Sequence, residues 1–495
     1  MTTTSATTAA TGPVDVPVAE RRAAIAVACV ATVMLMLDIS VVNTALEDIA
    51  AGLGTGLTGL QWVIDAYTLP LAAVVLSAGA IADRCGRKRV FAGGLVLFTL
   101  ASAACALAPG IGTLVAARAV QGLGAAVLFA TALALISEVT PSAAERARAL
   151  GVYGASIGAV FAVGPFVGGV LTDAIGWRAI FWCNVPIGLV TLALALRVRE
   201  SRDPRARRLD VPGQVALVVG LFLLVLALLR GNEDGWGSGP VVASLGGAAV
   251  ALVALVVIEH RSPAPMLPLT HFRRPAFSAP QVLVVGISAS FFAGFLYVTL
   301  YLQGVVGLSP LQTGLAYLPG TALVFVVSGM TAGLMSRFAP GALAVAGLLL
   351  VAAGMALFAS TTHADAGWAS ILPGFLLACV GTGLFNPAGS ALALAALPPE
   401  QSGLAAGAND TFRQTGLAVG VAWLGTFVPA AGPYADADAF VAGLHHAVLA
   451  GAVVALGCAV AGGLLLRQAA SARVGVQAQA SGGMGRPTST GRVPR

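Results

Sequence analysis

The sequence predicts an all-α integral membrane protein in which a two-helix hairpin is inserted between two six-helix bundles. Of its 495 residues, 58% are hydrophobic and only 10% are charged, and the mean hydropathy is +0.90. A water-soluble chain of this length needs far more polar residues to cover its surface, so lipid must cover much of this one. Apolar stretches long enough to cross a bilayer also follow one another along the chain.

Fourteen apolar stretches of about twenty residues are bounded by charged residues or by glycine and proline. They begin near Ala23, Gln61, Val90, Gly112, Ala147, Arg178, Val211, Pro240, Ala279, Gln312, Gly341, Ala369, Gly403 and Val441. An even number of crossings puts both termini on the same side of the membrane.

The basic residues predict which side this is. Of the 27 lysines and arginines, 23 lie in the tails or in the loops of one side. Cytoplasmic loops are rich in these residues, so both termini are expected in the cytoplasm. No nucleic-acid partner is expected, because the basic residues punctuate apolar stretches and do not gather with aromatic residues on a polar surface. Lys88 is the single lysine, and alanine and glycine are abundant, which is typical of a GC-rich bacterial genome and places the protein in a bacterial cytoplasmic membrane.

The fourteen stretches are not equivalent. The seventh and eighth contain no charged residue before Arg230, and they are flanked by an arginine-rich and a proline-rich segment. Without them, two sets of six remain, which predicts a transporter whose two halves rock around a site at mid-membrane. The expected parts are a cytoplasmic tail (1–22), an N-terminal six-helix bundle (23–197), a basic linker (198–210), the inserted hairpin (211–259), a second linker (260–278), a C-terminal six-helix bundle (279–466) and a disordered tail (467–495).

One short loop carries a high density of charge. The run GAIADRCGRKR, residues 79–89, places four cations and one acid between the second and third stretches. Its glycines allow two helix ends to approach, and its aspartate can accept hydrogen bonds from helix amino termini or from arginines. The residues expected to act here are Gly79, Asp83, Arg84, Gly86 and Arg87. The alternative is an ordinary stop signal at a helix end, which needs neither the glycines nor the acid.

Three charged residues fall inside predicted helices at a similar depth. Asp38 lies about 22 Å along the first helix, and Asp65 and Arg118 lie about 6 Å and about 9 Å from the outer starts of the second and fourth. Charges inside a membrane are costly and indicate function. A carboxylate whose proton affinity is raised by burial and lowered by an approaching arginine binds its proton according to conformation, which predicts proton coupling. The alternative is a structural pair between Asp38 and Arg118, with Asp65 solvated at the mouth.

These runs resemble those of a known family. GAIADRCGRKR is similar to the signature loop of the major facilitator superfamily. LDISVVNTAL (37–46), ARAVQGLGAA (117–126) and residues 402–427 resemble helix motifs of its fourteen-helix drug:proton antiporter branch. The resemblance implies the major facilitator fold and a part for Arg118 in proton transfer. Asp38 and Asn43 match the first-helix motif, whereas Glu47 stands where the branch usually has proline.

The fifth stretch predicts the direction of transport. GASIGAVFAVGPFVGGVL, residues 154–171, resembles a motif of antiporters rather than of uptake symporters. Its small residues permit close backbone contact and its proline permits a kink. The residues concerned are Gly154, Gly158, Gly164, Pro165, Gly168 and Gly169. The alternative is ordinary glycine-rich helix packing.

Candidate substrate contacts are spread over both halves. Asp410 and Arg413 are spaced i, i+3, so they are expected either to pair with each other or to contact substrate. Further candidates are Asn43 and the aromatic residues of the ninth stretch, Phe291, Phe292, Phe295, Tyr297 and Tyr301. An aromatic stripe serves at least as often in packing.

Together these patterns predict a monomeric transporter that exports small hydrophobic or cationic compounds, such as drugs or antibiotics, in exchange for protons. No metal or other cofactor is expected. Uptake, or carriage of a siderophore or metabolite by the same fold, stays an alternative. A membrane-bound enzyme or receptor has less support, because the sequence has no metal-spaced histidine cluster and no serine nucleophile elbow.

Overall fold

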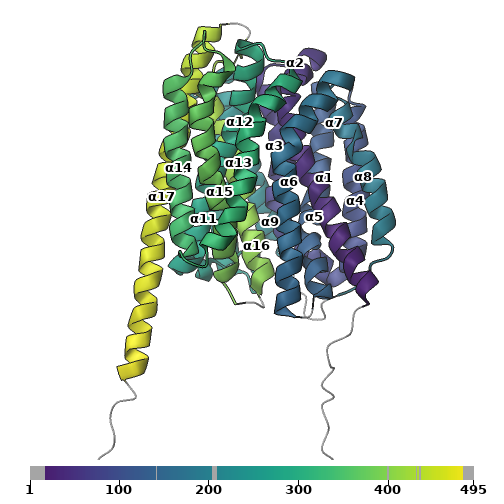
Figure 1. The fold of residues 1–495 in the computed structure, drawn as a ribbon, viewed down its shortest axis with the longest axis vertical. Helices are drawn as coiled ribbons and strands as arrows, with labels where there is room; N and C mark the ends of the chain where they lie inside the picture. The colour runs from purple at the N-terminus through teal and green to yellow at the C-terminus, as the bar shows by residue number, and fades with distance from the viewer. Residues whose placement is uncertain are drawn as a thin grey trace, which may run out of the picture.

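The computed structural model describes residues 17–140, 142–202, 209–398, 401–430, 432–433 and 436–482. Within these ranges every element of secondary structure is a helix (Figure 1). Twelve of the described helices are long and apolar enough to cross a membrane. The shorter apolar segment Ala179–Ala195 and the helix Ser402–Gly425 bring the number to the predicted fourteen, so the structure is compatible with that count.

The elements fall into two halves and a hairpin. The N-terminal half comprises α1 (Val18–Thr44), α2 (Leu46–Leu53), α3 (Leu57–Cys85), α4 (Arg87–Ala106), α5 (Ile111–Val139), α6 (Ala143–Ile175), α7 (Ala179–Trp182) and α8 (Asn184–Ala195). The hairpin is α9 (Val211–Asp234) and α10 (Gly239–Arg261). The C-terminal half comprises α11 (Pro275–Ile287), α12 (Ala293–Leu300), α13 (Pro310–Leu334), α14 (Pro340–Thr361), α15 (Leu372–Ala395), α16 (Ser402–Gly425) and α17 (Ala437–Gly482).

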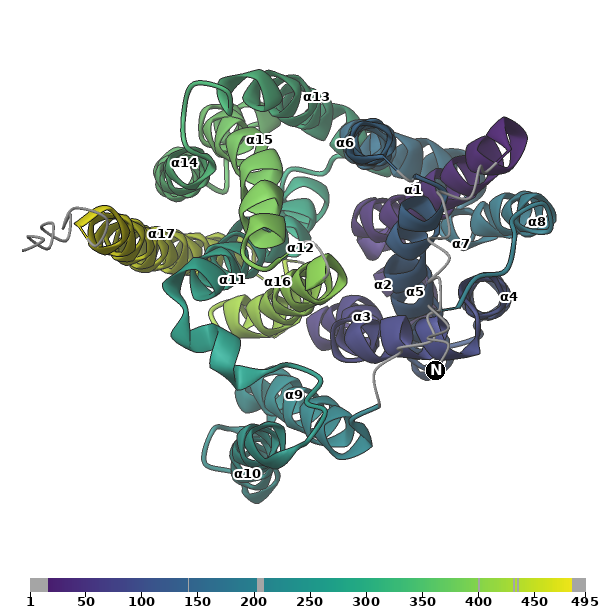
Figure 2. The ribbon, with the colours of Figure 1, turned by 90° about the horizontal axis from the view of Figure 1, so that it is seen from below.

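The two halves repeat one packing pattern. α4 packs on α5 as α14 packs on α15, and α1 packs on α6 as α11 packs on α16. The halves meet where α6 lies against α13 and α3 lies against α16, and we call these two contacts the seam (Figure 2). The hairpin stands outside the pattern, because α9 packs on α3 and α16 while α10 packs mainly on α9. This is the arrangement of an internally duplicated transporter, although the residue limits given above for the parts stay predictions.

Both ends of the helical chain lie on one face of the molecule. α1 begins and α17 ends on this side, which we call the terminal face, whereas α2 and α7 lie on the opposite, far face (Figure 1). The predicted disordered tail is wrong in its first part, because α17 continues to Gly482. Alanine, glutamine and arginine favour a helix there, and no proline interrupts it. Residues 483–495 lie outside the described residues, as do residues 1–16 and 203–208 of the predicted tail and linker.

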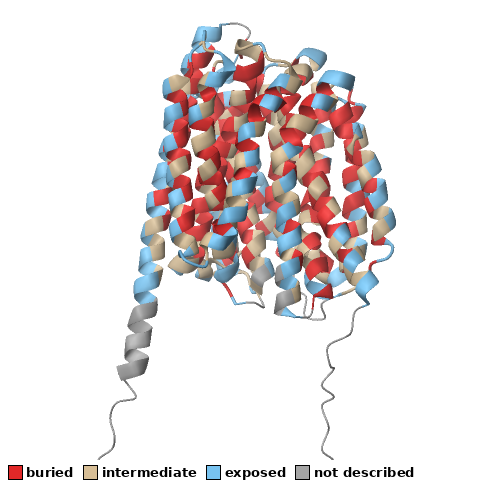
Figure 3. Ribbon diagram, viewed as in Figure 1, coloured by how far each residue is buried: buried red, intermediate tan, exposed pale blue. Residues whose placement is uncertain are grey.

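Burial follows the helix faces. Stretches of buried residues lie mostly on the helix faces turned toward other helices, and exposed ones mostly on the outer faces and at the ends of the bundle (Figure 3). Large apolar side chains are among the exposed ones, for example Val250 at 71% and Val453 at 68%, as expected where lipid is the solvent. Small residues let neighbouring helices approach closely, since a Cβ on Gly124 of α5 would lie 2.7 Å from the amide nitrogen of Phe98 on α4.

The seam is closed toward the far face. The side chain of Gln303, which follows α12, donates to the carbonyl of Thr44 at the end of α1 at 2.8 Å. Near the middle of the membrane, the Thr321 hydroxyl on α13 donates to the carbonyl of Ala162 on α6 at 2.7 Å. Among the described residues, no hydrogen bond between the two halves lies nearer the terminal face than this one. Hydrogen bonds therefore join the halves from the far face to mid-membrane, and nearer the terminal face α16 still touches α3, because a Cβ on Gly407 would lie 2.6 Å from Cδ2 of Leu76.

Candidate functional site

A buried ion pair lies between α1 and α5. Asp38 is fully buried and Arg118 is 2% exposed. Nη1 of Arg118 lies 2.5 Å from Oδ2 of Asp38. The two predicted coupling residues are thus brought together about 9 Å from the far end of α1. In a medium of low dielectric constant neither charge is tolerated without the other.

Uncharged polar residues complete the shell around Asp38. The side-chain amides of Gln121 on α5 and Asn184 on α8 each donate to Oδ1 of Asp38 at 2.8 Å. Both amides also donate to the hydroxyl of Ser102 on α4, at 3.2 Å and 3.0 Å. With Arg118, three N–H groups reach the carboxylate, and both of its oxygens act only as acceptors, as in the ionised form. We call Asp38, Arg118, Gln121, Asn184 and Ser102 the Asp38 network.

The arginine is fixed on its remaining sides. Its Nε donates to the carbonyl of Val63 on α3 at 3.1 Å, and Nη1 also donates to Oε1 of Gln121 at 2.8 Å. The guanidinium lies 4.2 Å from the centre of the Tyr67 ring and 5.8 Å from that of Phe181, within the range of cation–π attraction. Every one of these partners belongs to the N-terminal half, so the Asp38 network lies inside one rocking unit.

Asp65 is at a similar depth but outside the Asp38 network. α3 begins at Leu57, four residues before the predicted start at Gln61, so Asp65 lies about 12 Å inside the helix rather than about 6 Å. It is fully buried, and neither of its carboxylate oxygens has a hydrogen-bond partner. The alternative that placed it in solvent at the mouth is therefore wrong.

The charged loop is held by acids that the sequence pattern missed. Nε of Arg87 lies 3.0 Å from Oδ1 of Asp83, and its Nη1 lies 2.6 Å from Oε2 of Glu138 on α5. The carboxylate of Glu200, which follows α8, accepts hydrogen bonds from the backbone N–H groups of Lys88 and Arg89 at the start of α4. Glu138 and Glu200 lie near helix ends that carry several charged or polar residues, so the sequence does not indicate which acid contacts the loop.

The two glycines of this loop play different parts. Gly86 has φ of 111°, which favours glycine, and a Cβ there would lie 2.6 Å from Oε1 of Glu200. A Cβ on Gly79 would make only an ordinary contact at 4.0 Å with Ala130, so its predicted close approach is wrong. Arg84 is exposed.

The glycines of α6 allow close contact with two neighbouring helices, α1 and α13. A Cβ on Gly168 would lie 2.8 Å from Cα of Val41 on α1, and one on Gly164 would lie 2.4 Å from Oγ of Ser40. Gly169 faces the other half, and a Cβ on it would lie 2.4 Å from the carbonyl oxygen of Pro310 at the start of α13.

The three remaining motif residues of α6 are Pro165, Gly158 and Gly154. A Cβ on Gly314 of α13 would lie 2.5 Å from the carbonyl oxygen of Pro165, so the backbone at Pro165 also lies at the seam. A Cβ on Gly158 would lie 3.3 Å from the ring of Phe325 on α13. Gly154 would meet no atom within 4 Å, so for this residue the predicted close backbone contact is wrong.

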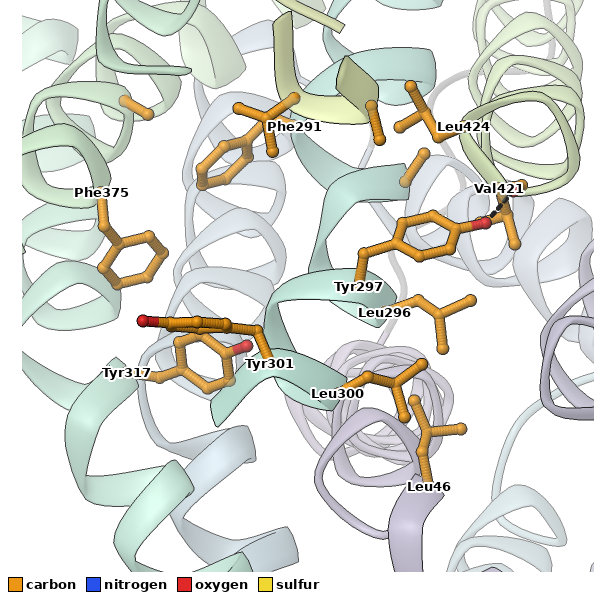
Figure 4. Packing of buried hydrophobic residues seen from close by; sticks show 14 of the residues in the cluster. Leu46, Phe291, Leu296, Tyr297, Leu300, Tyr301, Tyr317, Phe375, Val421 and Leu424 are labelled. Atoms are coloured by element: carbon orange, nitrogen blue, oxygen red, sulfur yellow. Dashed lines mark hydrogen bonds between the residues drawn. The ribbon is translucent and has the colours of Figure 1, made fainter. Parts of the chain in front are cut away.

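The candidate substrate contacts separate into fixed and loose groups. Tyr297 donates to the carbonyl of Val421 on α16 (Figure 4), and Tyr301 donates to the carbonyl of His363 at 3.0 Å. Asn43 bonds to its own helix, at the Ile39 carbonyl. These three side chains are engaged in the structure.

An aromatic cluster crosses between the halves. Phe161 of α6 packs edge-on against Phe292 and Phe295, at 5.6 Å and 6.4 Å between ring centres. Phe291 joins them at 5.6 Å and 5.2 Å. Two π-helical turns, Ser288–Phe292 and Tyr301–Val305, interrupt this ninth span, and such turns are frequent at functional sites.

Asp410 and Arg413 form the loose group. Nε of Arg413 lies 3.7 Å from Oδ1 of Asp410, and the two side chains are 29% and 14% exposed. This distance is too long for a hydrogen bond, so the pair is open to a further partner. Among the described residues, no group of three or more His, Cys, Asp or Glu side chains could hold a metal ion.

Comparisons with known proteins identify the family of the chain. The family model of the Major Facilitator Superfamily matches residues 28–421. The chain belongs to the major facilitator superfamily. The multidrug resistance protein Stp of Mycobacterium tuberculosis is 38% identical over 80% of the chain and 74% of that protein. The methylenomycin A resistance protein of Streptomyces coelicolor is 36% identical over 79% of the chain and 82% of that protein.

A third relative and two solved structures extend the comparison. The tetracenomycin C resistance and export protein of Streptomyces glaucescens is 34% identical over 81% of the chain and 74% of that protein. The peptide transporter POT in complex with sulfate has a TM-score of 0.60 at 16% identity, covering 89% of this chain and 95% of that one. The xylose transporter XylE from E. coli, in a partially occluded inward open conformation, has a TM-score of 0.59 at 15% identity, covering 89% and 98%. At these identities the two structures show the shared fold alone.

Proposed function

We propose that this superfamily member exports small hydrophobic or cationic drugs or antibiotics in exchange for protons across a bacterial cytoplasmic membrane. The observation that carries the proposal is the Asp38 network, in which a buried carboxylate holds an arginine that competes with a proton for it. The names of the relatives, which include multidrug resistance and antibiotic export, support the direction and the class of cargo.

The Asp38–Arg118 pair provides a reason for exchange. A proton on Asp38 removes the charge that holds Arg118, so proton binding and ion pairing exclude each other. In the state closed at the far face, Asp38 is paired and holds no proton, and substrate can enter from the terminal face. When the far face opens, separation of the pair lets Asp38 take up a proton as substrate leaves. Return of Arg118 then expels the proton on the other side.

The driving force is sufficient for export against a gradient. A membrane potential of about 100 mV contributes about 2.3 kcal/mol per charge. A difference of one pH unit adds about 1.4 kcal/mol. For an uncharged compound, one proton could therefore sustain an accumulation ratio of about several hundredfold, and for a compound with one positive charge, whose export offsets the charge of the proton, about tenfold, since each 1.4 kcal/mol corresponds to a factor of ten. No cofactor is needed in this scheme, and a single chain contains both halves.

The proposed orientation places the terminal face in the cytoplasm. Arg21, Arg87 and Arg261 all belong to helix ends on the terminal side, in keeping with the excess of basic residues in cytoplasmic loops. Asp410 and Arg413, the loosely paired charges on α16, are the proposed polar contacts for substrate. The aromatic cluster around Phe295 is the proposed apolar wall.

Everted membrane vesicles test this function. Ethidium and puromycin are added to vesicles energised by a proton gradient, and the movement of each compound and of protons is recorded. Export in exchange for protons predicts accumulation of compound inside the vesicles together with loss of luminal protons, and collapse of accumulation when the gradient is removed. Movement of compound in the same direction as protons would instead establish uptake by symport.

A further inference from the structure

Asp65 is a buried carboxyl that the Asp38 network does not use. Its side chain is fully buried, and both oxygens lack a hydrogen-bond donor. An ionised carboxylate in such a place costs several kcal/mol, because neither water nor a protein donor solvates it. The carboxyl group of Asp65 is therefore stable in the state closed at the far face only when it is neutral.

The charged groups on the helices packed against α3 do not compensate Asp65. On α5, Arg118 is bonded to Asp38. On α9, Glu233 accepts from Thr58, and Arg230 lies beside Asp234. On α16, Asp410 and Arg413 pair with each other. The cations of α4 bond to residues at the terminal face, and the charged residues of α2 are both acids. Among the described residues, none of these cations is paired with Asp65.

One helical turn from Asp65, on the same side of α3, a hydrogen-bonded cluster joins the two halves. The amide of Gln61 donates to the hydroxyl of Tyr297 on α12 at 2.8 Å and to the carbonyl of Val421 on α16 at 3.4 Å. The Tyr297 hydroxyl donates to the same carbonyl (Figure 4). Gln61 is 3% exposed, and Tyr297 and Val421 are each 1% exposed. We call Gln61, Tyr297 and the Val421 carbonyl the latch.

Asp65 lies beside the latch on the surface of α3. Gln61 and Asp65 are spaced i, i+4, so their side chains lie on one face of this helix, with about 5–6 Å between their Cβ atoms. A negative charge at Asp65 would therefore sit in a dry contact between α3 and two helices of the other half. Opening of the far face separates these helices, so it breaks the latch and admits water to Asp65.

We propose that Asp65 is a second proton-binding site, separate from Asp38, whose protonation is required for the latch to close the far face. The inference rests on the alternating access of the proposed function. When the far face is open, Asp65 is hydrated and exchanges its proton with the outer solution. When the latch closes, the carboxyl must be neutral, so acid on the outside favours the closed state. Gln61 lies one turn nearer the far end of α3 than Asp65, so opening of the latch gives Asp65 access from that side, and in this scheme its proton acts on the gate and is not carried across.

The test uses cysteine labelling and needs no exported compound. Leu300 is 1% exposed and lies at the far-face end of α12, next to Leu46 of the other half (Figure 4). The Leu300→Cys protein is labelled from outside with a membrane-impermeant maleimide between about pH 5.5 and about pH 8, a range in which a carboxyl group with a raised proton affinity titrates. The rates are divided by those of Gly237→Cys, an exposed position in the turn of the hairpin with open space around its Cβ, which removes the intrinsic pH dependence of the reagent. The unmodified chain gives the background of the natural cysteines.

The expected result is that labelling at position 300 rises with outer pH, by up to about tenfold per pH unit. Asp65→Asn, which is neutral at every pH, should label slowly and lose the rise with pH, so that any remaining dependence is the opposite one, in which acid favours opening through proton uptake by Asp38. Asp65→Glu should keep the slope, so the claim stays testable if the asparagine variant folds poorly. Gln61→Leu should label faster at every pH because the latch is lost.

Asp38→Asn separates this claim from the proposed function. It should keep the pH slope, since the two sites are distinct. Labelling that still rises with pH in Asp65→Asn, or a rise that disappears in Asp38→Asn, would overturn the gate site. Failure of proton-coupled export with an intact slope would overturn the proposed function alone.

Discussion

Asn184 on α8 donates a hydrogen bond of 2.8 Å to Asp38 on α1, and in doing so it ties the sixth span to the buried carboxylate of the first. The same amide donates to Ser102 on α4 at 3.0 Å. The carboxylate is thus held directly by donors from α5 and α8, and α4 supports it through Ser102, which accepts from two of these donors. Its contacts therefore respond to any shift of these helices within the N-terminal half.

The first prediction concerns this tie. Asn184→Ala removes one of the two donors to Oδ1 of Asp38, and an unmade hydrogen bond to a buried charge costs about 1–3 kcal/mol. We expect a lower melting temperature of the purified protein and weaker proton-coupled export. The control is Thr191→Ala on the same helix, whose hydroxyl bonds only to its own helix at the Ile187 carbonyl. Equal behaviour of the two variants would show that Asn184 does not support the carboxylate.

The second prediction concerns the charged loop. Asp83→Asn weakens the bridge from α3 through Arg87 to Glu138, and the expected result is reduced export with little loss of expression. The loop stabilises one of the two alternating states, so its loss shifts their ratio. Labelling of Leu300→Cys reports that ratio. Normal export together with unchanged labelling would show that Asp83 does not stabilise either state.

The third prediction separates two glycines of α6. Gly169→Ala places a methyl group where the Pro310 carbonyl lies 2.4 Å away, so it wedges the seam apart near the far face. Gly154→Ala meets no atom within 4 Å and gains the same helix propensity, so it is the matched control. We expect faster labelling at position 300 and lower export for Gly169→Ala alone. If both variants behave alike, close contact at Gly169 does not matter for transport.

The fourth prediction concerns the hairpin. Replacement of residues 211–259 by a flexible linker should preserve measurable export, because the hairpin lies outside the repeated packing pattern. It should also lower stability, because Gln214 donates to the Ala73 carbonyl on α3 and Asn232 donates to the Thr426 carbonyl after α16. Melting temperature and ethidium export measure the two effects. A deletion variant that inserts and is stable yet transports nothing would make the hairpin part of the mechanism.

The fold could be predicted from composition, and the pairing layer of Asp38 and Arg118 from the depth of each residue in the membrane. A charge in an apolar stretch has a position along the membrane that follows from the helical rise, so Asp38 and Arg118 could be placed in one layer. The sequence did not decide whether this pair is a proton site or a structural pair, and the observed geometry is compatible with both.

The remaining site residues depend on helix rotation, which depth does not give. Asp65 shares the layer of Asp38 but faces the seam, so it stands apart from the Asp38 network. Gln121 and Asn184 were missed because an uncharged amide in an apolar stretch lacks the high free-energy cost that makes a buried charge a functional candidate. Tyr297 was expected in the substrate wall, but its hydroxyl is engaged between the halves. Such cross-helix partners become visible only when the packing is known.

The central claim is that Asp38 exchanges a proton under the control of Arg118. Removal of one partner of a buried pair costs about 3–5 kcal/mol, so a single substitution alone does not distinguish coupling from structure. Asp38→Asn keeps size and hydrogen bonding but cannot take up a proton, and Arg118→Gln removes the competing charge. The double variant therefore restores a neutral, hydrogen-bonded pair without a titratable group.

The most direct test measures proton movement induced by ethidium in proteoliposomes that contain the parent, Asp38→Asn, or the double variant Asp38→Asn with Arg118→Gln. Proton movement is expected for the parent and for neither variant, while ethidium binding is retained. An active double variant that moves protons in exchange for ethidium would contradict this expectation and would leave Asp38 as a structural partner of Arg118.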